Sequence, residues 1–135
     1  MRLIVLAVGR LRPPYADDVQ HYLKLLARHA RVETIEVREE ERIAARIPER
    51  AFVSLLDRGG EQLDSLAFSR FLEHRRQAGR DVCFVVGGPL GLDLEDVDHR
   101  YSLGSLTLPH QLARVVLLEQ LYRAHKILAG EPYHY

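Results

Sequence analysis

Residues 83–92, "CFVVGGPLGL", lead an unbroken apolar run into three glycines and a proline. Gly87, Gly88 and Pro89 carry no acid or base, so their chemistry would be close approach of a ligand to bare backbone. Neither common phosphate motif is present. A Walker loop needs a terminal Lys followed by Ser or Thr, and the dinucleotide fingerprint needs G-x-G-x-x-G after the first strand. The stretch therefore predicts a tight turn or a site without such a phosphate grip.

A second stretch of similar character is "SLGSLTLPH", residues 102–110. Gly104 allows close approach to the backbone, and its neighbours supply apolar walls and hydroxyls: Leu103, Ser105, Leu106, Thr107 and Leu108. Open α/β sheets bind ligands at the carboxyl ends of strands, where both stretches are predicted to lie. Two such loops could hold a flat neutral heterocycle such as adenine by apolar contacts and main-chain hydrogen bonds. Each stretch alone fits a tight turn, and the pair leaves turn and site as open alternatives.

The elements that would position these loops alternate between strand and helix. Aliphatic and β-branched runs predict strands at 2–8, 31–37, 51–56 and 81–86, with a strand or strand-like loop at 102–108. Helices are predicted at 13–30, 38–47, 65–79 and 110–130, with a loop at 57–65 and a cap at Asp64 or Ser65. This pattern predicts one α/β domain over residues 1–135, with a mainly parallel sheet covered by helices on both faces.

The last predicted helix is apolar over well over half of its circumference. Its apolar residues are Leu112, Val115, Val116, Leu117, Leu118, Leu121, Tyr122, Ala124, Ile127 and Leu128. A helix packed on a sheet needs only one apolar stripe, so a second buried surface is predicted. A self-complementary homodimer interface is the favoured explanation, and deep burial within the monomer is the alternative.

Composition limits the classes of function. Lys and Arg together number 19, as do Asp and Glu, so the chain is formally neutral and not an obvious nucleic-acid binder. Only Lys24 and Lys126 are lysines; the arginine bias suits phosphate contacts, but high genomic GC content produces it too. Cys83, the sole cysteine, lies in an apolar run and is expected to be a buried packing thiol. The seven histidines lack metal-ligand spacing, and no signal peptide or membrane span is expected, which favours the cytoplasm.

Three segments together resemble the RlmH-type methyltransferases of the SPOUT superfamily: "VVGGPLGL", "YSLGSLTLPHQLARVVLLEQLYRAHKI" and "PYHY". The resemblance extends over nearly the whole chain, including "LIVLAVGRLRPPY" and "LLDRGGEQLDSLAFSRFL". It implies an S-adenosyl-L-methionine-dependent enzyme that methylates N3 of a pseudouridine in large-subunit ribosomal RNA. It also implies a C-terminal trefoil knot whose loops form the cofactor pocket, and a homodimer built on the last helix.

Site residues follow from the same resemblance. Leu56, Gly87 and residues 103–108 match the family's cofactor-binding positions, and Gly88 and Pro89 shape the glycine loop. A base or a positive charge would help N3 to lose its proton, and four residues are candidates: Tyr133, His134, His110 and Arg123. In the family the C-terminal tail reaches the active site of the dimer, which favours His134. His110 could instead cap the last helix, and Arg123 could pair with Glu119.

Three departures from the family pattern leave an alternative open. Leu90 stands where Glu is usual, no basic residue follows "PYH", and the connection between the second and third strands is short. Leu90 and the missing basic residue favour this alternative, a non-catalytic ribosome- or RNA-associated module that retains the cofactor pocket. For the enzyme, basic residues such as Arg10, Arg12, Arg114 and Arg123 are expected around the pocket. An assembled ribosome, rather than free RNA, is the expected substrate.

Overall fold

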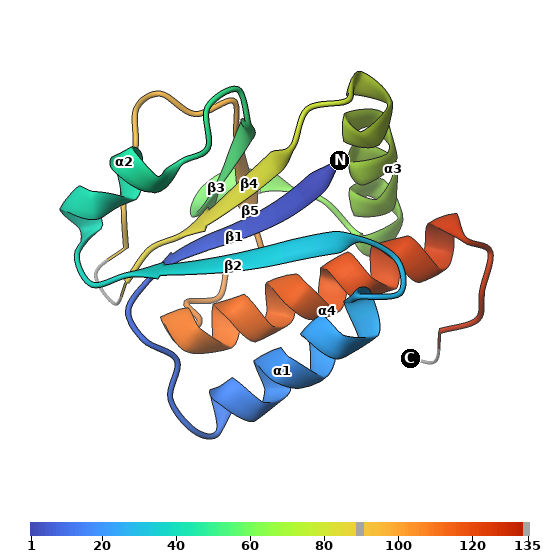
Figure 1. The fold of residues 1–135 in the computed structure, drawn as a ribbon, viewed down its shortest axis with the longest axis horizontal. Coiled ribbons are helices and arrows are strands. Elements are labelled where there is room, and N and C mark those ends of the chain that lie inside the picture. Colours follow the sequence, from blue (N-terminus) through green and yellow to red (C-terminus); the bar gives the residue numbers. More distant parts are fainter. Residues whose placement is uncertain (89–90, 134–135) are drawn as a thin grey trace.

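The centre of the molecule is a five-stranded parallel sheet, in a computed structural model that describes residues 1–88 and 91–133 (Figure 1). Its strands are β1 (Arg2–Val8), β2 (Arg31–Val37), β3 (Phe52–Gln62), β4 (Val82–Val86) and β5 (His99–Ser102). They are ordered β2-β1-β4-β3-β5, and every neighbouring pair is parallel. The predicted parallel α/β sheet is confirmed.

Helices cover both faces of this sheet, as predicted, but unequally. Helices α1 (Tyr15–Leu26), α3 (Ser65–Ala78) and α4 (His110–Leu128) pack on one face (Figure 1). The other face is covered by α2 (Ile43–Arg46) and by apolar residues of the segment 92–97. Successive side chains of β1 point alternately into these two cores, which is why the whole strand is apolar.

Helix α3 shows how local sequence sets an element's limits. Asp64 is the cap, because its carboxylate accepts a hydrogen bond of 2.7 Å from the Ala67 N–H. Gly79 ends the helix in the left-handed conformation, with φ of 82°. Of the two predicted caps, Asp64 is confirmed.

Strand β3 is longer than predicted and contains a bulge. The sequence predicts a loop at 57–65, but the strand continues to Gln62. Leu56 and Glu61 both pair with Tyr101 of β5, so the four residues between them leave the ladder. A Cβ on Gly60 would lie 2.6–2.7 Å from the backbone carbonyl of Arg100, so this glycine lets the bulge lie against β5. The polar sequence has no strand periodicity, and only pairing with β5 makes it a strand.

Two further predictions were wrong in detail. Residues 103–109 contain no strand, because β5 ends at Ser102 and Gly104 takes a positive φ of 132°. The helix predicted at 38–47 is a 3-10 turn, Glu40–Arg42, followed by the single turn of α2. Its charged residues supply no apolar stripe, and only Ile43 is fully buried against the sheet. In the described parts of the chain, no helix combines the length and apolarity needed to cross a bilayer.

The bulge predicts a sharp difference between two adjacent glycines. Replacing Gly60 by Ala should lower the free energy of unfolding by about 1–3 kcal/mol, because the new methyl group meets backbone atoms that cannot turn aside. The matched control is Gly59→Ala, whose methyl group would have only the Asp57 carboxylate nearby, at 3.6 Å. Its effect should stay within about 1 kcal/mol. Urea denaturation measures both, and equal losses would contradict the proposed contact.

Candidate active site

The two glycine-containing loops meet at one cavity at the carboxyl edge of the sheet. Eight of the predicted cofactor residues line it: Leu56, Gly87, Gly88, Leu103, Gly104, Leu106, Thr107 and Leu108. The first loop follows β4, the second follows β5, and β3 contributes the floor beside them. Ser105 does not line the cavity, and Pro89 lies outside the described residues. The tertiary structure thus brings the two stretches together, while their binding of a cofactor stays a prediction.

The glycines that opened the sequence analysis serve two purposes. A Cβ on Gly87 would lie 2.7 Å from the Cβ of Leu92, so the bare position lets the loop fold back on itself. The N–H of Gly91 donates to the carbonyl of Gly88 at 2.9 Å, which closes the turn. Gly87 and Gly88 also border the cavity. The tight turn and the ligand site are therefore compatible: the turn is real, and it forms one wall.

The β3 bulge supplies polar groups to the cavity that the sequence analysis did not assign. Asp57 and Arg58 both line it. The Asp57 carboxylate accepts hydrogen bonds of 2.9 Å from the Gly59 N–H and from Arg100. The backbone donor of Gly59, followed by Arg100, lowers the pKa of Asp57, so it is ionised at neutral pH. Arg58 donates to the Thr107 hydroxyl at 2.6 Å and so links β3 to the second loop. The signal for this site was the "DRGG" stretch, which was predicted as a loop.

His110 is the one predicted catalytic residue that lines the cavity among those the structure describes. It is the first residue of α4, but the cap position is Pro109 and no side-chain capping bond forms, so the capping alternative is wrong. Burial lowers the pKa of His110, and the positive charges of Arg114 and Arg12 lower it further. The imidazole is therefore neutral at pH 7 and able to accept a proton.

Arg123 and Tyr133 lie away from the cavity in this chain. Arg123 pairs with Glu119 at 2.7 Å, as the alternative predicted, and its guanidinium lies 4.3 Å from the centre of the Tyr133 ring. The Tyr133 hydroxyl donates to Glu119 at 2.9 Å. Glu119 and Arg123 follow His110 along α4 by about 14 to 20 Å, at 1.5 Å per residue. Figure 1 shows α4 running from the carboxyl edge of the sheet to the opposite side of the molecule. His134 lies outside the described residues.

The expected cluster of four arginines around the pocket is wrong in two members. Arg123 is at the far part of α4, as above, and Arg114 is buried with only 3% of its surface exposed. Arg114 faces inward because its guanidinium donates to the carbonyls of Val8 and Gly9 and pairs with Glu36. Arg10 and Arg12, in contrast, are exposed.

The sole cysteine and the metal-ligating side chains of the described residues were the other candidates for a reactive centre. Cys83 is fully buried, and burial raises the pKa of its thiol to about 12, which confirms the predicted packing role. In residues 1–88 and 91–133, no three His, Cys, Asp or Glu side chains are grouped so that they could hold a metal ion. The chemistry available at the cavity is apolar enclosure, main-chain contacts, the Asp57 carboxylate, the Arg58 guanidinium and the neutral imidazole of His110.

Comparison with known proteins defines the class. Residues 1–134 match the family described as "Predicted SPOUT methyltransferase". The chain therefore belongs to the SPOUT methyltransferase family.

Individual proteins of known name also resemble the chain over nearly its whole length. The chain is 46% identical to "Ribosomal RNA large subunit methyltransferase H" of Rubrobacter xylanophilus, over 99% of this chain and 98% of that protein. The proteins of the same name from Gluconacetobacter diazotrophicus and Carboxydothermus hydrogenoformans are 43% and 39% identical, over 99% of this chain and 96% and 99% of their own lengths. These alignments run over 150 to 159 positions, so the relatives carry residues with no counterpart among the 135 here.

The environment of His110 predicts a specific change in its titration. Replacing Arg12 by Gln removes a positive charge that disfavours the imidazolium, so the pKa of His110 should rise. Titration of the imidazole resonances by NMR measures this, with His110→Gln to assign the signal. Arg70→Gln, which removes an exposed charge from α3, is the matched control and should leave the pKa unchanged. If the pKa of His110 is the same in Arg12→Gln as in the wild type, Arg12 does not lie close to His110 as the structure has it.

Proposed function

We propose that the chain is an S-adenosyl-L-methionine-dependent methyltransferase that acts on N3 of a pseudouridine in large-subunit ribosomal RNA. The observation that carries this proposal is the meeting of the two predicted cofactor loops at one cavity, in a chain of the SPOUT family. The names of the full-length relatives support large-subunit RNA as the substrate. The alternative of a non-catalytic binding module gains no support from these comparisons.

The residues around the cavity fit the cofactor. Leu103, Leu106 and Leu108 offer apolar surface for an adenine ring, and the two loops expose backbone for main-chain hydrogen bonds. The Asp57 carboxylate on the cavity wall is ionised but paired with Arg100, and Arg58 lines the same cavity, so a sulfonium would meet charges of both signs. The cofactor, when bound, supplies a methyl group that its sulfonium already activates.

The protein's own task is therefore orientation and removal of one proton. The imide-like N3 of pseudouridine becomes a good nucleophile only when its proton leaves, and the neutral His110 at the cavity can accept it. The cavity walls fix the direction of approach, which lowers the entropy lost on reaching the transition state. His110 is the candidate for the base within this chain, and a tail histidine, His134, is the candidate from a partner.

A homodimer is part of the proposal, because Tyr133 contacts the far part of its own α4 rather than its own cavity. A tail that takes part in catalysis would then have to reach the cavity of a second copy. The outward stripe of α4 suits such a contact: Leu112, Val116 and Ile127 are only partly covered, and Leu128 is 41% exposed. Apolar surface of this kind on a helix is typical of an isologous interface.

The family also supports two further features as proposals. One is the trefoil knot, in which the loops after β4 and β5 would pass one another to form the cavity. The other is action in the cytoplasm on assembled ribosomal particles. A neutral chain of this size gains binding energy and specificity from a folded ribosomal surface that naked RNA does not offer.

The function predicts cofactor binding and methyl transfer that depend on the cavity. In calorimetry the purified chain should bind S-adenosyl-L-methionine, and mass spectrometry should find one new methyl group on a pseudouridine of ribosomal particles, with less transfer to naked RNA. Leu106→Arg places a cation at the exposed rim of the cavity, where it would repel the sulfonium, and should weaken cofactor binding about tenfold. Leu66→Arg, an exposed leucine of α3, is the matched control and should have no effect. Binding without transfer would instead support the non-catalytic module.

Catalysis across the dimer predicts complementation between two inactive variants. Leu106→Arg lacks a working cavity, and His134→Ala lacks the tail histidine. If each tail serves the partner's cavity, random mixing should restore about a quarter of wild-type activity, because half of the dimers are mixed and each has one complete site. If the activity of the mixture equals the sum of the activities of the separate variants, the tail of one subunit does not act in the cavity of its partner. Wild-type activity of His134→Ala alone would remove His134 from the mechanism.

A further inference from the structure

The segment that follows β1, residues 9–12, lies beside the cavity. A Cβ on Gly9 would lie 3.9 Å from Nε2 of His110 and 3.8 Å from Arg114. The positive charge of Arg12 is close enough to disfavour the imidazolium of His110. Arg10 and Arg12 are both exposed, and neither has an acidic partner among the residues that the structure describes.

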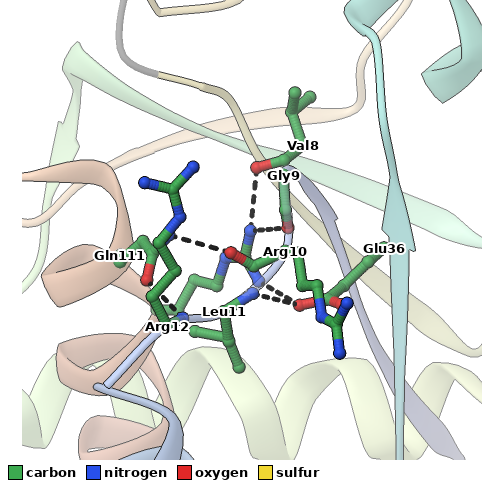
Figure 2. Close-up of polar contacts among 8 residues, drawn as sticks. Val8, Gly9, Arg10, Leu11, Arg12, Glu36 and Gln111 are labelled. Carbon is green, nitrogen blue, oxygen red and sulfur yellow. Dashed lines mark hydrogen bonds and ion pairs between the residues drawn. The ribbon is translucent and has the colours of Figure 1, made fainter. Parts of the chain in front are cut away.

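Side chains from other elements hold this segment by its backbone (Figure 2). Nε2 of Gln111 donates to the Arg10 carbonyl at 3.0 Å, and Oε1 of Gln111 accepts from the Arg12 N–H at 2.9 Å. Glu36 of β2 accepts from the Leu11 N–H at 3.0 Å. Arg114 donates to the carbonyl of Val8 at 2.8 Å and also to that of Gly9. Four backbone groups of the segment are thus tied to side chains: the carbonyls of Gly9 and Arg10 and the N–H groups of Leu11 and Arg12.

Two of the three anchoring side chains, Gln111 and Arg114, are buried, whereas Glu36 is exposed. Gln111 is 8% exposed and Arg114 is 3% exposed. Burial of a guanidinium costs free energy unless it is paired, and Arg114 offsets part of this cost through Glu36 at 2.7 Å and the two carbonyls, while its buried Nε has no hydrogen-bond partner in the part of the chain that the structure describes. A loop could be closed with less costly groups. The arrangement instead fixes one backbone shape, and in that shape the arginine side chains at 10 and 12 remain in solvent.

We propose that Gln111 and Arg114 are positioning residues that hold residues 9–12 so that Arg10 and Arg12 form a phosphate-binding rim beside the cavity. Its ligand is the sugar–phosphate backbone of the RNA substrate, and this assignment rests on the function proposed above. Two unpaired guanidinium groups are suited to phosphate oxygens, which they can contact in bidentate geometry. In a chain with no net charge, two exposed guanidinium groups on one short segment give that segment a local positive charge.

Binding to large ribosomal subunits, measured at several salt concentrations without cofactor, tests the rim. Each lost phosphate contact lowers the slope of log K against log salt by about 0.7–0.9, so Arg10→Ala with Arg12→Ala should lower it by about 1.4–1.8. Affinity for S-adenosyl-L-methionine should not change. Arg70→Ala, an exposed arginine of α3, is the matched control and should leave the slope as it is. An unchanged slope in the double variant overturns the proposal.

The positioning role has a separate readout. Gln111→Ala leaves both arginines in place, yet it should raise KM for ribosomal particles while kcat and cofactor affinity stay near wild type. Added to the Arg10 and Arg12 double variant, it should weaken particle binding no further, because the groups it positions are gone. A loss that simply adds, or a loss of cofactor binding, shows a structural role alone and overturns the positioning claim.

The outcomes also separate this inference from the proposed function. Salt-dependent binding through Arg10 and Arg12 without methyl transfer would retain the rim and reject the enzyme. Methyl transfer with a slope insensitive to both arginines would retain the enzyme and reject the rim. Sedimentation of the double variant tests whether a second copy of the chain, rather than RNA, contacts these arginines. A change in oligomeric state would assign the arginines to a contact between two copies of the chain and overturn the RNA assignment.

Discussion

The central strands β1 and β4 of the parallel sheet carry apolar, buried side chains on both faces, which leaves the edges of the sheet for binding. Residues of β1 and β4 are buried on one side by α1, α3 and α4 and on the other by α2 and the segment 92–97. Because all strands run the same way, their carboxyl ends meet at one edge, and the loops that follow them must share it. The cavity between the loops after β4 and β5 is a direct consequence of this constraint.

Three segments shape that edge: the glycine loop after β4, the bulge in β3 and the segment after β1. Each is held by a different kind of interaction. The glycine loop closes on itself, because Gly87 leaves room for Leu92. The β3 bulge is held by Asp57 and Arg100, and it places a carboxylate on the cavity wall. The segment after β1 is tied down by Gln111 and Arg114 of α4. Helix α4 therefore does more than cover the sheet: its first turns organise the cavity rim, while its last turns contact the tail through Glu119 and Arg123.

The charge at each site is likewise set by local pairing between side chains rather than by the composition of the whole chain. The chain is neutral as a whole, and several of its arginines are engaged within the protein, such as Arg100 with Asp57 and Asp93. Arg114 shows that an arginine near the cavity is not necessarily available to a ligand, because its guanidinium faces the interior. What the cavity presents to a ligand is thus set by a few local groups, Asp57, Arg58 and His110, rather than by net charge.

Much of this protein follows from local sequence. The apolar and β-branched runs determined β1, β2 and β4 almost to the residue and the start of β3. For β1 and β4 the reason is two-sided burial in a parallel sheet, which requires continuous apolar runs. Asp64 and Gly79 determined the ends of α3 through a cap and a left-handed turn. The two glycine-containing stretches were recognisable as a pair, and the resemblance to SPOUT methyltransferases rested largely on their amino-acid sequences.

Tertiary structure decided the rest, because it depends on contacts between residues far apart in the chain. Pairing with β5 made a strand of the polar residues 57–62, which have no periodicity of their own. The packing of α4 against the end of β1 turned Arg114 inward and left Arg10 and Arg12 in solvent, although the three look alike in sequence. The length of α4 separated His110 from Tyr133, which a list of candidate residues cannot show. Local patterns specify elements, whereas the partner of each polar group is known only once the elements have been packed.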